Sequence, residues 1–195
     1  MSFSRTVIAL AVGALFAVPA LAQSTASEVQ RNVNQQERIE QGLQSGQLST
    51  KEAAKLEKGE AHIEKMEQRA EANGKLSDAE KQRIEQAQNK ESQEIYRDKH
   101  NAQTGNPNSA SSQRMQADVQ RNVNQQQRIE QGVQSGQLTN REVGNLEKGQ
   151  AQVNRKEANA GANGHISANE QRNIQAAENH QSHKIHKEKH NARER

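Results

Sequence analysis

The sequence predicts an all-α protein made of two tandem copies of an up-down-up three-helix module, joined by a flexible linker. Three observations support this prediction. The chain is internally duplicated, each copy carries two helix-stop and helix-start signals, and apolar residues recur at the spacing of a helix face.

The duplication is visible when "VQRNVNQQERIEQGLQSGQLS" from Val29 is set beside "VQRNVNQQQRIEQGVQSGQLT" from Val119, an offset of 90 residues. Between the copies, "QTGNPNSASSQ" (103–113) has the Gly, Pro, Ser and Asn content of a flexible linker. The predicted organisation is a signal peptide at 1–22, helical repeats at 23–102 and 116–195, and a linker at 103–115.

Each copy contains the pattern Gly-x-apolar-Ser/Thr-x-x-Glu twice. The pattern begins at Gly46, Gly74, Gly136 and Gly164. A glycine in the left-handed conformation ends a helix, and Ser or Thr followed three residues later by Glu forms a capping box that begins the next helix. These signals divide each copy into three helices.

The apolar residues form narrow stripes between these turns. Leu56, Gly59, Ile63, Met66 and Ala70 recur at steps of three and four, as on one helix face. A looser stripe precedes them at Val29, Val33, Ile39 and Leu43. Because large apolar residues are scarce, each copy is expected to be marginally stable alone. It would gain order from a ligand, its sister copy or another chain, self-association included.

The N-terminus has the features of a secretory signal. Arg5 precedes a short apolar run and the small-residue pattern Ala20-Leu21-Ala22, so cleavage near Ala22 is expected. The mature chain should then be periplasmic or secreted, without a transmembrane segment. It has no cysteine, which excludes disulfides.

The composition also bears on function. The formal net charge of +3 arises from interspersed charges of both signs, and the chain has one tyrosine and no tryptophan, so nucleic-acid binding is not expected. No nucleophile-elbow motif or phosphate-binding Gly-rich loop is present, and an enzyme is not expected.

The run "RIEQGLQSGQLSTKEAAKLEKGEAHIEK" with the closing "IYRDKHN" resembles uncharacterised small exported proteobacterial proteins that have Gly-turn helical hairpins. This resemblance implies no particular activity. The segment "RAEANGKLSDAE" (69–80) faintly resembles an EF-hand loop. Its first, third and fifth positions are Arg69, Glu71 and Asn73, a poor ligand set for calcium, so calcium binding is not expected.

Four of the seven histidines lie near the C-terminus, at His180, His183, His186 and His190. On a helix they share one face, and spacings of three and four allow pairs to chelate Cu(II), Ni(II) or Zn(II). The ends of the set are about 15 Å apart, so two weak half-sites are expected, His180 with His183 and His186 with His190. Alternatively, this is a solvated polar face, since the first copy has Lys90, Gln93 and Tyr96 at three of these positions.

The sequence therefore predicts an exported cell-envelope protein that binds or buffers divalent transition metals through its His-rich last helix. The alternative is a non-enzymatic, chaperone-like or structural protein of the envelope stress response that binds other helices through its apolar seams. A third hypothesis is binding of an anionic surface through the basic end "HKIHKEKHNARER".

Overall fold

Six α-helices and no strands make up residues 20–191, the part of the chain that this computed structural model describes. The helices are α1 (Ala20–Ser45), α2 (Thr50–Glu71), α3 (Asp78–Lys99), α4 (Ala110–Gln134), α5 (Asn140–Gly161) and α6 (Ala168–Lys189). The all-α prediction is confirmed. The predicted signal peptide lies outside the described residues except for its last three positions, which belong to the start of α1.

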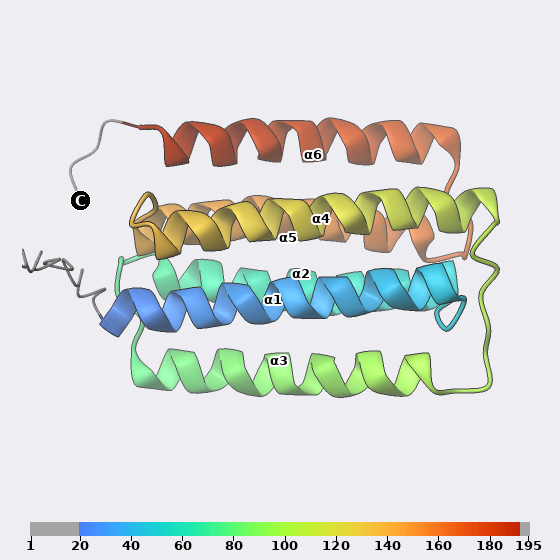
Figure 1. Ribbon diagram of the computed structural model, residues 1–195, viewed down its shortest axis with the longest axis horizontal. Coiled ribbons are helices and arrows are strands. Elements are labelled where there is room, and N and C mark those ends of the chain that lie inside the picture. The colour runs from blue at the N-terminus through green and yellow to red at the C-terminus, as the bar shows by residue number, and fades with distance from the viewer. Residues whose placement is uncertain (1–19, 192–195) are drawn as a thin grey trace, which may run out of the picture.

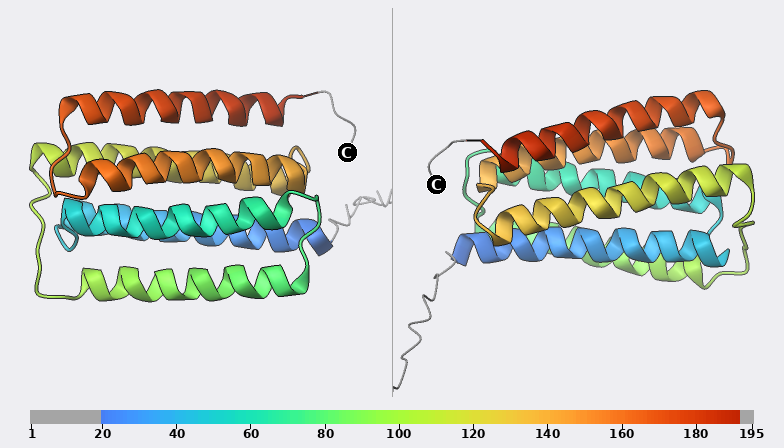
Figure 2. Two further views of the ribbon diagram at one scale, coloured as in Figure 1. Left: turned by 180° about the vertical axis from the view of Figure 1, so that it is seen from behind. Right: turned by 45° about the horizontal axis from the view of Figure 1, so that its top comes forward.

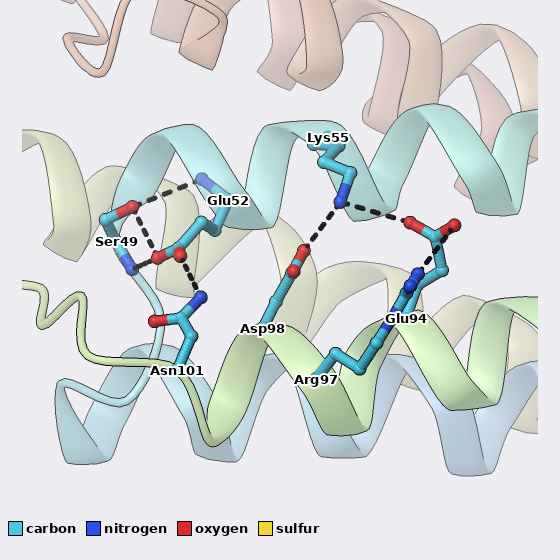
Figure 3. A network of polar contacts seen from close by, with 7 residues as sticks. All are labelled: Ser49, Glu52, Lys55, Glu94, Arg97, Asp98 and Asn101. Carbon is cyan, nitrogen blue, oxygen red and sulfur yellow. Dashed lines mark hydrogen bonds and ion pairs between the residues drawn. The ribbon is translucent and has the colours of Figure 1, made fainter.

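The predicted turns and caps are present at all four positions. Gly46, Gly74, Gly136 and Gly164 have φ angles of 74°, 79°, 69° and 83°. At the start of α2, the Ser49 side chain accepts a hydrogen bond from the Glu52 backbone N–H at 3.2 Å, and the Glu52 carboxylate accepts one from the Ser49 N–H at 2.9 Å (Figure 3). The same capping box begins α3, α5 and α6. Local sequence therefore sets these helix boundaries.

The two copies pack against each other more extensively than the helices pack within either copy. Helix α2 runs antiparallel along α5, and α1 runs antiparallel along α4, while α3 and α6 lie on opposite outer sides (Figures 1 and 2). In Figure 1, α1 and α4 lie in front of α2 and α5. The four central helices thus come equally from both copies.

The apolar core is shared in the same way. One buried cluster combines Ile39, Leu56 and Ile95 of the first copy with Met115 and Ile174 of the second. A second cluster places Val29 of the first copy among residues of the second. The arrangement as two self-contained three-helix bundles is not confirmed, because the apolar stripes that the sequence reveals are buried largely between the copies.

The connection between the copies is shorter than the predicted 103–115 linker. Ser109 caps α4, so the helix begins at Ala110 and includes residues 110–115. The segment before α4 contacts the turn between α1 and α2, where the Gly105 N–H donates a hydrogen bond to the Gly46 carbonyl at 2.8 Å. A Cβ at position 105 would lie 2.3 Å from the Leu48 carbonyl oxygen, so only glycine fits there.

Close approach of α2 to α5 depends on two symmetry-related contacts. A Cβ on Gly161 would lie 2.8 Å from the Ala54 Cβ, and a Cβ on Gly144 would lie 3.0 Å from the Glu71 Cβ. Residues 54 and 144 are equivalent in the duplication, as are 71 and 161. At each crossing one partner is therefore glycine.

Replacing Gly161 by valine is expected to destabilise the fold by about 1–3 kcal/mol, because the added carbons must push α5 away from α2. The free energy of unfolding, measured by chemical denaturation, tests this. Asn159→Val is the matched control, since it places the same β-branched residue at an exposed position of the same helix. Equal losses in the two variants would contradict the close contact.

Candidate functional site

The four candidate histidines are all exposed. His180, His183 and His186 lie on α6, and His190 caps its C-terminal end. The structure therefore leaves their rings accessible to ligands from solvent.

The closest pair is His186 with His190, whose ring centroids are 4.3 Å apart. The His190 Nδ1 lies 2.7 Å from the backbone carbonyl oxygen of His186. Because a carbonyl oxygen only accepts hydrogen bonds, Nδ1 carries the proton and the lone pair of the neutral ring is on Nε2. Metal-binding histidines commonly have this arrangement.

The first copy contains the same arrangement with one change. Tyr96 stacks on His100 with centroids 4.1 Å apart, and the His100 Nδ1 lies 2.7 Å from the Tyr96 carbonyl oxygen. The hydrogen bond at the end of the helix is therefore structural in both copies. What distinguishes the second copy is the second imidazole, at His186.

His180 is in a different environment. His180 lines a hollow of about 260 Å³ together with Lys148, Lys156 and Lys184, whose positive charges oppose a bound cation. Among residues 20–191, no group of three or more His, Cys, Asp or Glu side chains is placed to hold a metal ion. The four histidines thus do not form one site.

The Lys-His-Asn sequence at the end of the third helix in each copy has a structural role. Lys99 donates to the Arg38 carbonyl at 3.2 Å, and Asn101 donates to the Glu52 carboxylate at 2.8 Å, which ties the end of α3 to α1 and to the capping box of α2 (Figure 3). In the second copy Lys189 donates to the Arg128 carbonyl at 3.1 Å, and Asn191 donates to Glu142 at 2.6 Å. The element therefore fixes the third helix in each copy.

The interior of the bundle contains many carboxyl groups that the sequence analysis did not single out. Every glutamate of α2 is buried, and Glu57, Glu60, Glu64, Glu67 and Glu71 follow one another at steps of three and four. Their spacing is that of a buried helix face, and this signal was available in the sequence. The buried acids of the other helices include Glu28, Glu91, Asp118, Glu147, Glu157 and Glu178.

Apart from the capping residue Glu52, whose hydrogen bonds with Asn101 and Ser49 lower its pKa, burial raises the pKa of these groups, because a charged carboxylate loses hydration in the interior. The pKa rises to about 8 for Glu28, Glu57 and Glu178, and to about 7 for Glu67, Glu91 and Asp118. For Glu60, Glu64, Glu71, Glu147 and Glu157 the pKa is well above its usual value, from burial first and then from repulsion by neighbouring acids. At pH 5–6 these interior acids are therefore largely uncharged, and near neutral pH those with a pKa of about 8 remain so.

Side-chain amides are the main partners of the interior carboxyls. Asn32 donates to Glu67 at 2.8 Å, and Gln36 donates to Glu57 at 3.0 Å. The second copy repeats both contacts, with Asn122 donating to Glu157 at 2.7 Å and Gln126 donating to Glu147 at 3.1 Å. These polar layers recur in the two copies because the duplication preserved both partners.

Two interior contacts cross between the copies. Glu64 accepts hydrogen bonds from Gln126 and Asn154, at 3.1 and 3.0 Å. Repulsion also acts across the two copies, since Glu57 of the first copy adds to the effect of burial in raising the pKa of Glu157 of the second. Protonation of these carboxyls therefore relieves repulsion between the copies.

Comparison of the chain with models of protein families, with curated proteins and with solved structures found no match. Within the described part of the chain, no helix combines the length and the apolar character needed to cross a membrane.

Proposed function

We propose that the protein is an exported, non-enzymatic protein of the cell envelope that binds divalent transition metal ions at His186 and His190. The observation that carries this proposal is the His190 hydrogen bond to the His186 carbonyl, which leaves the Nε2 lone pair of His190 free beside a second exposed imidazole. Two imidazoles one helical turn apart suit Cu(II), Ni(II) and Zn(II).

Binding at this pair is expected to be weak and exchangeable. Two protein ligands leave the remaining coordination positions to water, and Lys187 and Lys189 lie next to the pair in sequence. Such a site suits buffering of metal ions better than permanent retention. His180 and His183 form the second, weaker half-site of the proposal, because Lys148 and Lys184 lie beside His180 in the same hollow.

Two substitutions test the His186–His190 pair, one by removing a metal ligand and the other by adding a ligand at the equivalent position of the first copy. His186→Tyr recreates the Tyr96–His100 pair of the first copy, so it removes one ligand and keeps the ring contact. We expect calorimetric titration with Cu(II) to show at least a tenfold loss of affinity at this site. Tyr96→His should conversely create an equivalent pair in the first copy and raise the number of bound ions by one.

The control is the melting temperature, which should be nearly unchanged because both substitutions affect exposed rings at the same structural position. If His186→Tyr binds copper as the unmodified protein does, or if Tyr96→His adds no site, the metal-binding proposal is wrong.

Helix binding remains the alternative proposal. The apolar seams on which it depends are buried between the copies, and Tyr96 is the only large apolar side chain exposed among residues 25–191. We take the three-helix copy to be the repeating element of this protein. Binding a client helix would therefore require the two copies to separate first.

A further inference from the structure

The exposed positions of α2 form a single basic stripe. They are Lys51, Lys55, Lys58, His62, Lys65 and Arg69, at alternating steps of four and three. All the glutamates of this helix are buried on the other side. The helix thus presents an outer surface with no exposed acid.

Helix α5 continues this surface. Its exposed positions are Arg141, Asn145, Lys148, Gln152, Arg155, Lys156 and Asn159, and its glutamates are likewise buried. We call the outer surface of the two helices the α2–α5 face; these helices run side by side in the view from behind (Figure 2). By contrast, none of the exposed positions of α4, or of α1 from residue 25 onward, is charged.

A groove runs along the α2–α5 face. One hollow of about 250 Å³ is bordered by Lys58, His62 and Arg155, and the next, of about 200 Å³, by Lys65 and Lys148. Lys65 and Arg155 line both hollows, and alanines at 61, 151 and 158 contribute to their walls. The groove therefore has small apolar walls and cations from both helices.

Few of these cations are neutralised by a neighbour. Lys55 forms ion pairs with Glu94 and Asp98 of α3, each at 3.1 Å (Figure 3). Among the described residues, no other side chain of this face takes part in an ion pair. The equivalent of Glu94 in the second copy is Lys184, so one of the acids that pairs with Lys55 is replaced by a cation in the hollow between α5 and α6.

We propose that the α2–α5 face binds a linear polyanion built from phosphate groups, which lies along the groove between the two helices. The helices are 22 residues long, which corresponds to about 33 Å of groove. A linear chain can contact the cations of both helices in succession. This binding is separate from the proposed metal site on α6.

Two other classes of polyanion fit the face less well. A membrane surface is usually bound with apolar side chains inserted between the lipids, and this face exposes none. Single-stranded nucleic acid is held by stacking on aromatic side chains, and the exposed Tyr96 lies on α3 rather than on this face. A phosphate chain needs only the charges.

The test is binding of inorganic polyphosphate of defined length to the full mature protein at several salt concentrations. We expect saturable binding that weakens steeply with salt. The variant with Lys58, Lys65, Lys148 and Arg155 replaced by Gln should lose at least tenfold in affinity, and its salt dependence should fall by about 3 in the log–log slope, by analogy with phosphates of nucleic acids.

The control replaces the same amount of charge elsewhere, at the exposed Lys75, Arg83, Lys90 and Lys187. This variant should retain affinity within about threefold, and His186→Tyr should bind polyphosphate as the unmodified protein does. The proposal is overturned if polyphosphate does not bind or if the two four-residue variants lose affinity equally. Tighter binding, at equal phosphate concentration, to vesicles of anionic lipid or to duplex DNA would overturn it too.

Discussion

The protein is expected to be more stable near pH 5 than at pH 9, with a loss of at least about 5 kcal/mol of unfolding free energy, or at least about 10 °C in melting temperature, over this range. The cause is the set of buried carboxyls with raised pKa, such as Glu28, Glu57 and Glu178 at about 8. Thermal unfolding followed by circular dichroism across this pH range tests the expectation.

The sign of the effect follows from proton binding in the two states. Unfolded glutamates titrate near pH 4.5, whereas these folded ones hold their protons to about pH 7–8 or above. Their stabilising contribution is therefore complete below the unfolded pKa and is lost as the pH rises through the folded pKa. The capping residues Glu80 and Glu170 act in the opposite direction, since hydrogen bonds lower their pKa, but their contribution is lost only below about pH 4.5.

Glu60→Gln isolates one interior carboxyl. Both of its oxygens lack a hydrogen-bond partner, and the equivalent residue of the second copy is already Gln150. We expect this variant to be more stable than the unmodified protein at pH 8, and its stability to vary less with pH, by about 1.4 kcal/mol per pH unit. Asp78→Asn, which alters an exposed carboxylate, should leave the dependence unchanged. If stability instead increases from pH 5 to pH 9, the interior acids are ionised in the fold.

Neither copy is expected to fold when the other is absent. Residues 23–106 alone would expose the surface that now packs on Met115, Val119, Ala160, Ile166 and Ile174. Separation would also admit water to Glu64, which accepts hydrogen bonds from Gln126 and Asn154 of the second copy. Circular dichroism and sedimentation of each separate copy should show an expanded chain with reduced helix content.

The matched control is the same protein with its chain cut between the copies by a protease site near Asn106. Because the shared core is unaffected by the cut, the two pieces should remain associated and helical. A separate copy that is monomeric and unfolds cooperatively at the temperature of the full protein would show that the shared core is dispensable.

Local features of the fold were predictable because they depend on neighbouring residues. The capping boxes at Ser49, Ser77, Thr139 and Ser167 each rest on a residue three positions away. The pairing of α2 with α5 was not predicted, because the order of the helices along the chain does not determine which two helices pack their apolar stripes against each other. It depends on complementary contacts such as Ala54 with Gly161.

The distribution of charge was harder to infer than the helices. Composition suggested interspersed charges with a formal net charge of +3. On α2, however, the lysines and arginine face solvent and the glutamates face the core, so each interior carboxyl that stays neutral makes the net charge one unit more positive. Ionisable residues are usually exposed, so the sequence analysis did not assign the glutamates to the core. The periodic spacing of Glu57, Glu60 and Glu64 would have indicated it.

The neutral interior can be observed by carbon-13 NMR of the folded protein with glutamate labelled at the side-chain carboxyl, recorded from pH 4 to pH 9. We expect two groups of resonances, one including the capping residues Glu80 and Glu170, whose pKa is lowered by hydrogen bonds, and an interior group, including Glu57 and Glu67, that stays protonated to about pH 7 or above. Titration of every glutamate below pH 5.5 in the folded protein would contradict the neutral interior on which the predicted pH dependence rests.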